Sequence, residues 1–320
     1  MAKEEAEVTA VVCTRGRGCG VARTVTAILD GTHRQPRVLI VDQSDDDSTF
    51  EAIERFLPDP RFMYVRVSSR GLSHARNAAL RLAGTELVAF TDDDCVPEAA
   101  WLEGLLAEAA TVDGPAMFFG PLVPDADSMR VGMVPGWRPG EAGRVSARWT
   151  SYTLGGFGGN MAINRAAIEL TGKFNPLLGR GAPFPSAEEG EYAFRVVNAG
   201  GTVVELNSPS VVHYGPVPWP KLRAALRHDF RATGRMLAWC VRRGEMNALV
   251  QLAFCLRREA HVVGGQMVRR RRPLGLRRPC WLLSGFVAGL VLGQPAAAAV
   301  HAAKDDVVWI SGAGEVEWQR

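Results

Sequence analysis

The chain has 320 residues, of which 47% are hydrophobic and 22% charged, and this composition excludes an intrinsically disordered protein and suits one large α/β domain with an additional segment. The net charge of +3 is unevenly distributed, because residues 221–278 contain fifteen Lys or Arg and three acids, whereas the other residues contain 22 Lys or Arg and 31 acids. The last third of the sequence therefore favours an anionic partner, such as a membrane surface, a phosphorylated lipid or a nucleic acid.

Residues 8–120 alternate between short apolar runs and amphipathic stretches. We predict strands at Val8–Cys13, Arg37–Asp42, Met63–Val67, Glu86–Thr91 and Ala116–Gly120, and helices at Val21–Asp30, Ser48–Phe56, Ser73–Leu82 and Ala99–Ala109. Because the strands are continuous apolar runs, both faces of the sheet should be covered, as in a parallel sheet. The alternation predicts a doubly wound, mostly parallel α/β sheet of Rossmann-like type, in which ligands bind beyond the carboxyl ends of the strands.

Polar residues directly follow three of these predicted strands. They are Thr14 and Arg15 after the first strand, Asp42 at the end of the second, and Asp92, Asp93 and Asp94 after the fourth. Three adjacent carboxylates repel one another unless a cation binds, and hard divalent cations such as Mg²⁺ or Mn²⁺ prefer oxygen ligands. The triplet therefore indicates either a metal site or a group of solvated acids that cap the next helix, with Pro97 at its start.

Other nucleotide and phosphate sites receive less support from the sequence. The glycines after the first strand do not form G-x-G-x-x-G, because Val21 stands at the last position, and no Walker A motif is present. Phosphoryl transfer through an aspartate needs a lysine or threonine at a later strand end, and no obvious one is found. Asp42 can accept hydrogen bonds from a base or a ribose, whereas the acids at 45–47 are more typical of helix caps.

The middle of the chain contains more loops than the first 120 residues. Residues 123–150 are rich in Pro and Gly and are predicted as a long loop, and a glycine-rich stretch follows at 155–159. We expect helices from about Arg165 and from Glu188, a loop at 178–186, and short strands at Thr202–Leu206 and Ser210–His213. After Pro220 the pattern becomes long, basic and helical, so we divide the chain into a domain at 1–220 and a basic helical region at 221–320.

The order and spacing of several short motifs resemble those of family 2 glycosyltransferases with the GT-A fold. The motifs are Val11 to Arg15, Val41-Asp42, Gly71 to Asn77, Phe90 to Asp94, Gly159 to Ala162, Gly172 to Asn175, Leu178 to Gly181, Glu188-Glu189 and His213. The resemblance covers residues 8–240 and implies a GT-A transferase domain at 1–220 with a basic helical appendage.

This resemblance implies an inverting, metal-dependent hexosyltransferase-type enzyme that moves a sugar from a nucleotide-diphosphate donor, usually UDP-linked, to an acceptor hydroxyl. The donor-binding residues it implies are Thr14, Arg15, Asp42, Arg76, Asp92, Asp93, Gly159 and Asn160. Asp92 and Asp94 correspond to the DxD acids, Asp93 lies towards the ribose and Arg76 lies near the base. Asp92 and Asp94 are the expected ligands of Mg²⁺ or Mn²⁺. His213 is either a further ligand, a phosphate contact or a structural histidine.

The acidic pair Glu188-Glu189 departs from the family pattern. The family's general base is usually the aspartate of a Glu-Asp pair at the start of a helix, and Glu189 stands at that position. One more methylene moves the carboxylate, and misplacements of about 1 Å can cost roughly a hundredfold in rate. Glu189, beside Glu188, is therefore the expected base for a shifted acceptor. The alternative is a catalytically weak homologue that binds nucleotide sugar or acts as a membrane-associated interaction protein.

The basic region suggests a location for the protein. Its apolar run at 281–293 is shorter than the ~20 residues needed to cross a bilayer, so we expect either a segment lying on an anionic membrane surface or a core helix with a solvated basic face. The acceptor is then a glycan, a lipid-linked molecule or a small molecule. No aromatic residues interleave with the arginines, which disfavours nucleic acid.

The cysteines and the first residues of the chain favour a cytoplasmic protein. The six cysteines form no C-x-x-C pair, which disfavours a zinc ribbon and a disulfide framework and favours reduced thiols. Residues 1–13 lack the layout of a secretory signal peptide. We therefore expect a cytoplasmic protein that is peripheral on the inner face of the plasma membrane if the basic region contacts lipid.

Overall fold

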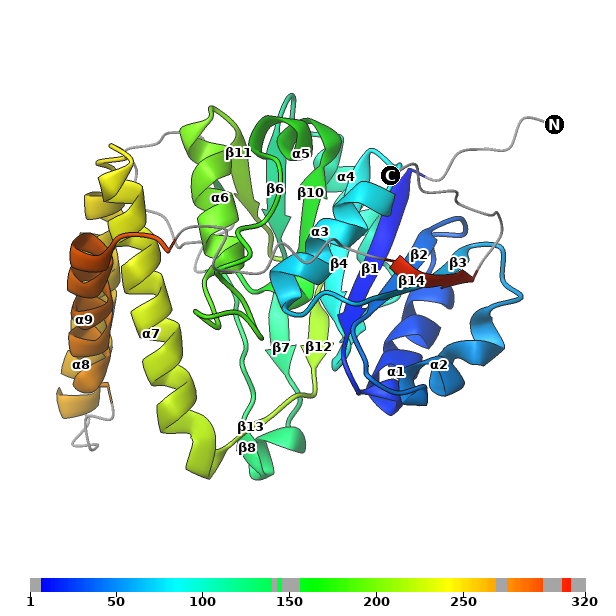
Figure 1. Ribbon diagram of the computed structural model, residues 1–320, viewed down its shortest axis with the longest axis horizontal. Helices are drawn as coiled ribbons and strands as arrows, with labels where there is room; N and C mark the ends of the chain where they lie inside the picture. Colours follow the sequence, from blue (N-terminus) through cyan, green and yellow to red (C-terminus); the bar gives the residue numbers. More distant parts are fainter. Residues whose placement is uncertain (1–6, 140–142, 146–155, 269–274, 296–306, 312–320) are drawn as a thin grey trace.

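The computed structural model describes residues 7–139, 143–145, 156–268, 275–295 and 307–311. Within these residues a nine-stranded sheet is covered by helices on both faces, and a layer of three long helices lies beside it (Figure 1). The alternate residues of the first strand explain this arrangement. Val11 packs in the hydrophobic cluster on one face of the sheet, and Ala10 and Val12 pack in the cluster on the other face. The α/β class predicted from the continuous apolar strands is therefore confirmed.

The first 120 residues contain every strand and helix that was predicted there, with ends that differ by a few residues. The elements are β1 Val8–Thr14, α1 Gly18–Leu29, β2 Arg37–Asp42, α2 Ser48–Ile53, β3 Phe62–Val67, α3 Leu72–Leu82, β4 Leu87–Asp92, β5 Cys95–Pro97, α4 Trp101–Ala109 and β6 Ala116–Phe119. β5, which has three residues, is the one strand among them that the sequence pattern did not indicate.

The large sheet has the strand order β14-β3-β2-β1-β4-β10-β6-β11-β9. β1 pairs in parallel with β2 and β4, so Thr14, Asp42 and Asp92 lie together at the carboxyl ends of neighbouring strands. β10, Met161–Asn164, is antiparallel to both β4 and β6 and separates them. The sequence did not predict β10, because its four residues directly follow the glycine-rich stretch. The mostly parallel, doubly wound sheet is confirmed, with this antiparallel insertion.

Residues 122–218 contain a series of short elements besides β10. They are β7 Leu122–Pro124, β8 Gly132–Met133, β9 Gly143–Val145, α5 Arg165–Thr171, α6 Glu188–Asn198, β11 Thr202–Glu205, β12 Val211–His213 and β13 Val217–Pro218. The prediction of an uninterrupted loop over residues 123–150 is wrong, because β8 and β9 lie within it. β5, β12 and β7 form a small separate sheet in which His213 is opposite Cys95.

The basic C-terminal region packs against the large sheet and its helices. Its elements are α7 Trp219–Arg242, α8 Ala248–Val268, α9 Arg277–Leu292 and β14 Val307–Ser311, which pairs antiparallel with β3. Met236 and Trp239 of α7 and Phe286 of α9 belong to the same hydrophobic cluster as Phe194 of α6. α7 therefore lies beside α6 (Figure 1). In the described part of the chain, no helix has both the length and the apolar character needed to cross a membrane.

Candidate functional site

The candidate site lies beyond the carboxyl ends of β1 and β4. Asp92 is the last residue of β4, and Asp93 and Asp94 form the turn that leads into β5. Pairing of β5 with β12 brings His213 to the same turn, although the two strands are far apart in sequence. The acidic triplet therefore lies at the sheet edge where open α/β sheets bind their ligands.

Asp94 and His213 have the geometry of two ligands of one metal ion. Asp94 Oδ1 lies 3.3 Å from His213 Nε2, close to the ~3 Å between neighbouring ligands of a six-coordinate ion with bonds of about 2.1 Å. His213 Nδ1 lies 2.8 Å from the Pro135 carbonyl oxygen, so Nδ1–H donates to it and Nε2 is free to face an ion. Burial lowers the pKa of His213, but the bonds to Asp94 and Pro135 outweigh it and the net shift is upward.

Cys95 lies next to this pair without being a suitable ligand for a hard cation. One ligand atom each from Asp94, Cys95 and His213 lie within 4.8 Å of one another. Cys95 is fully buried, and burial raises the pKa of its thiol well above the usual value, so the sulfur stays protonated. Among the described residues Asp92 is not part of this cluster, and its side chain is 38% exposed. Asp94 and His213 are therefore the pair in this cluster that suits a hard divalent cation.

Arg17 is the cation that neutralises the acidic triplet. Its Nη1 donates to Asp93 Oδ1 at 3.1 Å and to Asp94 Oδ2 at 2.6 Å, and its side chain is 58% exposed. Thr14 Oγ1 donates to the other oxygen of Asp93 at 2.7 Å. Burial raises the pKa of Asp93 to about 6, and Arg17 and Thr14 oppose this rise. Thr14 and Asp93, both predicted to contact the donor, are thus joined by a hydrogen bond.

Arg76 is the cation on the opposite side of the site. It is only 2% exposed, with Nη1 3.1 Å from Glu188 Oε1 and Nη2 4.0 Å from Asp92 Oδ1. Burial and the adjacent Glu189 raise the pKa of Glu188 to about 8, against the effect of Arg76. Burial likewise raises the pKa of Asp92, and Arg76 opposes it. One buried cation therefore faces three acids, and Glu188 keeps its proton at neutral pH.

The backbone directs Glu189 towards the glycine-rich stretch. Ala187, the residue before α6, has a φ of 73°, a left-handed conformation that is uncommon outside glycine. After this turn Glu189 Oε1 accepts a hydrogen bond from the Gly158 N–H at 3.1 Å. A Cβ at Gly158 would collide with the Arg76 guanidinium, and one at Gly159 would lie 3.2 Å from Asp92 Oδ2. These glycines let the backbone pass between the acidic triplet and Glu189.

Asn160 has a structural position next to these glycines. It is fully buried, and its Oδ1 accepts a hydrogen bond from Trp101 Nε1 at 2.9 Å. Its Nδ2 donates to the carbonyl oxygens of Pro121 at 2.9 Å and Pro209 at 3.0 Å. These bonds use both amide protons, so the side chain ties three loops together rather than facing open space. In this stretch, the backbone and Gly159, rather than the Asn160 side chain, are therefore the groups that can make the predicted contact with the donor.

Asp42 and Arg15, also predicted to bind the donor, contact protein groups in this structure. Asp42 is fully buried, Tyr64 donates to its Oδ2 at 2.7 Å, and the Ser44 N–H donates to its Oδ1 at 2.8 Å. Arg15 is exposed, and its Nη2 lies 3.2 Å from Asp45. Neither side chain touches the acidic triplet, although both follow strands at the same sheet edge.

Two residues of the site were missed by sequence reasoning. Arg17 lies in a loop where only the glycines were considered, and its proximity to the strand end was the available signal. Asp229 is one of three acids in the basic region, which was also a signal. Asp229 Oδ1 lies 3.9 Å from Arg180 Nη2 and has no hydrogen bond among the described residues. Burial raises the pKa of Asp229, and Arg180 opposes this rise.

The sequence family agrees with this geometry. The family model of glycosyl transferase family 2 matches residues 9–170, about half of the chain. The chain belongs to glycosyl transferase family 2. The segment matched by the family model contains the acidic triplet and Gly159, whereas Glu189 and His213 lie beyond it.

Two relatives of this family 2 chain are glycosyltransferases from prokaryotes. Pre-mycofactocin glycosyltransferase of Mycobacterium tuberculosis is 34% identical over 107 residues, which make up 31% of this chain and 20% of that protein. The match thus spans a fifth of that relative's length. Glucosyl-dolichyl phosphate glucuronosyltransferase of Haloferax volcanii is 23% identical over 216 residues, or 65% of this chain and 69% of that protein.

Solved structures confirm the predicted GT-A fold. Mannosyltransferase PcManGT from Pyrobaculum calidifontis, in complex with GDP-Man and Mn²⁺, has a TM-score of 0.61 at 18% identity, covering 91% of this chain and 89% of that one. TarS 1–349 of S. aureus, in complex with UDP-GlcNAc, has a TM-score of 0.53 at 16% identity, covering 89% and 90%. At these identities the likeness concerns the fold.

Proposed function

We propose that the protein is an inverting, metal-dependent glycosyltransferase that moves a sugar from a nucleoside diphosphate donor, UDP-linked, to an acceptor hydroxyl. The arrangement of Asp94 and His213 on one side of Gly158-Gly159 and of Glu189 on the other carries this proposal. Leaving group and base must act on opposite faces of the anomeric carbon in a single displacement, and the two sides of the site supply these two functions. The donor sugar would then lie beside Gly158-Gly159.

Asp92, Asp94 and His213 would hold the cation. A bound divalent cation neutralises the charge that develops on the diphosphate as it leaves. The imidazole nitrogen favours Mn²⁺ over Mg²⁺, because Mg²⁺ prefers oxygen ligands. The Mn²⁺ in the PcManGT complex supports this choice. Arg17 pairs with Asp94 Oδ2, whereas Asp94 Oδ1 faces His213, so its exposed guanidinium would share this carboxylate with the cation and could reach a phosphate oxygen.

Glu189 would act as the general base. Its carboxylate lies at the N-terminus of α6, where the helix dipole favours negative charge, and the Gly158 N–H orients it. Buried Arg76 contacts protonated Glu188 and so fixes the start of α6, where Glu189 lies. We therefore assign Arg76 a positioning role in addition to its predicted place near the base of the nucleotide. Thr14, Asp42 and Asp93 remain our predicted contacts of the nucleoside.

The UDP donor and the acceptor class are further parts of the proposal. TarS, with UDP-GlcNAc bound, supports a UDP-sugar, whereas PcManGT, with GDP-Man bound, is a reason to test both bases. The acceptor is a glycan, a lipid-linked molecule or a small molecule. The basic face of the C-terminal region supports attachment to an anionic membrane surface.

Donor turnover tests the proposal directly. UDP- and GDP-linked sugars are incubated with the protein and Mn²⁺, and release of the nucleoside diphosphate is measured with and without EDTA. We expect turnover that EDTA abolishes, Asp94→Ala to lose both turnover and the thermal stabilisation by UDP and Mn²⁺, and Glu189→Gln to lose turnover alone. Full activity in either variant contradicts the mechanism. Binding of UDP without any turnover by the unmodified protein supports the alternative of a catalytically weak homologue.

A further inference from the structure

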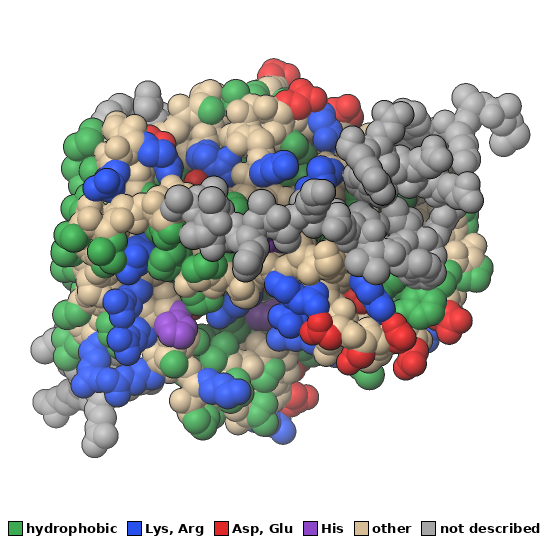
Figure 2. All heavy atoms as spheres, viewed as in Figure 1, with side chains coloured by type: hydrophobic (Ala, Val, Ile, Leu, Met, Phe, Trp, Pro, Cys, Tyr) green, Lys and Arg blue, Asp and Glu red, His purple; other side chains and the backbone are tan. Residues whose placement is uncertain are grey.

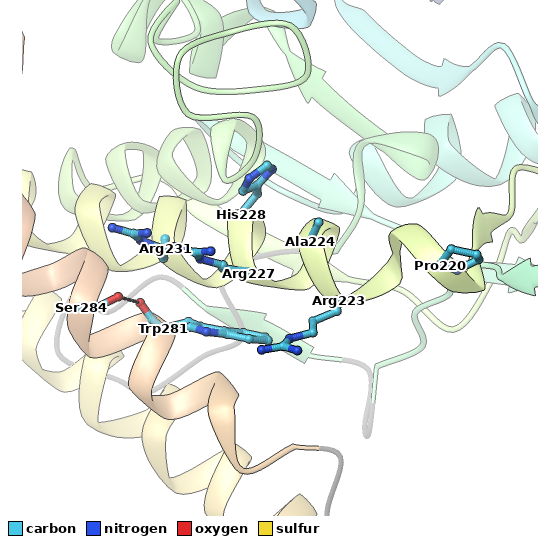
Figure 3. Close-up of a pocket in the computed structure, with 8 residues that line it drawn as sticks. All are labelled: Pro220, Arg223, Ala224, Arg227, His228, Arg231, Trp281 and Ser284. Atoms are coloured by element: carbon cyan, nitrogen blue, oxygen red, sulfur yellow. Dashed lines mark hydrogen bonds between the residues drawn. The ribbon is translucent and has the colours of Figure 1, made fainter.

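A groove between α7 and α9 lies outside the site described above. Its volume is about 570 Å³, within the ~300–1,000 Å³ typical of small-molecule sites. Arg223, Arg227 and Arg231 of α7 line one wall, and Trp281 and Ser284 of α9 line the other (Figure 3). Because the arginines are four residues apart, they extend from one face of the helix into the same groove.

These three arginines have no anionic partner in the described part of the chain, where no ion pair or hydrogen bond involves their side chains. Like charges four residues apart destabilise a helix. The same row continues to Arg235, whose pKa is lowered by burial and by Arg231. Figure 2 shows Lys and Arg side chains gathered along α7. The groove therefore presents positive charge that the protein itself does not neutralise, and an anion bound there would relieve the repulsion.

The exposed face of α9 beside the groove is apolar. Leu283, Val287 and Val291 recur every four residues and are 41%, 57% and 74% exposed. Ser284, which lines the groove, directly follows Leu283, so this apolar stripe of three residues borders the groove. A ligand that combines an anionic head with a hydrocarbon chain matches both surfaces at once.

We propose that the groove binds the phosphate head of a lipid, whose hydrocarbon chain lies along the apolar stripe. Guanidinium groups match phosphate oxygens in geometry and charge. His228 of α7 also lines the groove. A role for this lipid as the acceptor rests on the proposed function.

Vesicle binding by the full chain tests the groove. Phosphatidylcholine vesicles that contain phosphatidic acid, whose head group is a phosphate monoester, are compared with a second set of phosphatidylcholine vesicles. The second set contains enough phosphatidylserine to give the same total charge. We expect the unmodified protein to bind phosphatidic acid about tenfold more tightly, and Arg227→Glu to lose roughly tenfold or more of that affinity. Arg257→Glu, which makes the same charge change at an exposed position of α8 outside the groove, is the matched control. Equal affinity for the two lipids, or equal losses in the two variants, would overturn the proposal.

A second pair of variants separates a lipid from free phosphate. Val287→Ser should weaken vesicle binding by several-fold and leave binding of inorganic pyrophosphate unchanged, whereas Val131→Ser, at a 65% exposed position elsewhere, should change neither. Binding of pyrophosphate as tight as that of vesicles, with no effect of Val287→Ser, would exclude the lipid. Donor turnover by the unmodified protein distinguishes the two proposals, because vesicle binding without turnover contradicts the proposed function alone, and turnover without vesicle binding contradicts the groove alone.

Discussion

The two sides of the active site balance their acids in different ways. On the triplet side, Asp93 and Asp94 pair with Arg17, whose side chain is 58% exposed. On the α6 side, Glu188 pairs with Arg76, whose side chain is 2% exposed. An exposed arginine can leave its partners at little cost, because it is already largely hydrated. Removing a buried arginine leaves its buried acidic partners without a compensating charge.

This difference indicates which charges are exchangeable during the reaction. Under the proposed function, the triplet side would bind a cation and a diphosphate and release them in each cycle, and an exposed arginine suits that requirement. The α6 side would keep the Glu189 carboxylate in one position, and buried Arg76 with protonated Glu188 beside it suits that requirement. The predictions below test this contrast from its strongest consequence to its weakest.

Removing Arg76, the buried arginine of the α6 side, should have the largest effect on stability and turnover. Arg76→Ala leaves the carboxyl groups of Glu188 and Asp92 without their buried donor, and leaving a buried polar group without its partner costs about 1–3 kcal/mol. We expect a loss of that size in the free energy of unfolding, measured by urea denaturation, together with loss of donor turnover. Arg34→Ala, at an exposed position, is the control and should change the stability little. A small loss in Arg76→Ala would mean that the α6 side is not held by this pair.

Shortening the base should have the next largest effect. Glu189→Asp withdraws the carboxylate by one methylene and weakens its bond to the Gly158 N–H, so kcat should fall about a hundredfold with little change in donor affinity. Steady-state kinetics with a saturating UDP-sugar measure this change. A rise in kcat would show instead that the site keeps the geometry of the usual family aspartate and that Glu189 impairs it.

The sequence predicted the acidic triplet well because local features determine it. Apolar runs define β1 and β4, and their parallel pairing brings their polar ends together. The partners of the triplet depend on contacts between distant segments. His213 reaches Asp94 through pairing of β5 with β12. The strand at Ser210–His213 was predicted, and the family resemblance made His213 a candidate ligand, but the pattern did not indicate β5, because three residues are too few to show a period.

Some predicted ligand contacts could not be judged from sequence for the same reason. Asp42 ends a strand and was predicted to contact the nucleoside, but the hydroxyl of Tyr64 on the neighbouring strand β3 occupies its Oδ2. Asn160 belongs to a family motif, but Trp101 of α4 and two proline carbonyls use its amide. Whether a polar side chain faces a ligand or another protein group depends on the packing of neighbouring elements.

The proton on Glu188 gives a smaller effect that depends on pH. The pKa of Glu188 is raised from 4.5 to about 8, so the folded protein keeps a proton that the unfolded chain releases. The stability of the folded protein therefore falls as the pH rises from 4.5 to about 8. Glu188→Gln cannot ionise and keeps a similar shape, so its Tm should rise relative to that of the unmodified protein across this window. A Tm difference that is constant with pH would mean that Glu188 is ionised throughout.

Removing Arg17, the exposed arginine of the triplet side, should have the smallest effect on the stability of the folded protein and a specific effect on metal binding. Arg17→Ala should leave Tm nearly unchanged, because solvent screens a pair whose arginine is 58% exposed. Arg17 donates to Asp94 Oδ2 at 2.6 Å, next to the Oδ1 that faces His213, and its positive charge opposes a cation there, so the variant should bind Mn²⁺ alone a few-fold more tightly by calorimetry. Affinity for UDP in the presence of Mn²⁺ should fall, since the guanidinium of Arg17 no longer meets a phosphate. Arg15→Ala removes an exposed arginine of the same loop that pairs with Asp45, and it should change neither affinity. If both variants bind Mn²⁺ like the unmodified protein, Arg17 does not compete with the cation, and the triplet side is as fixed as the α6 side.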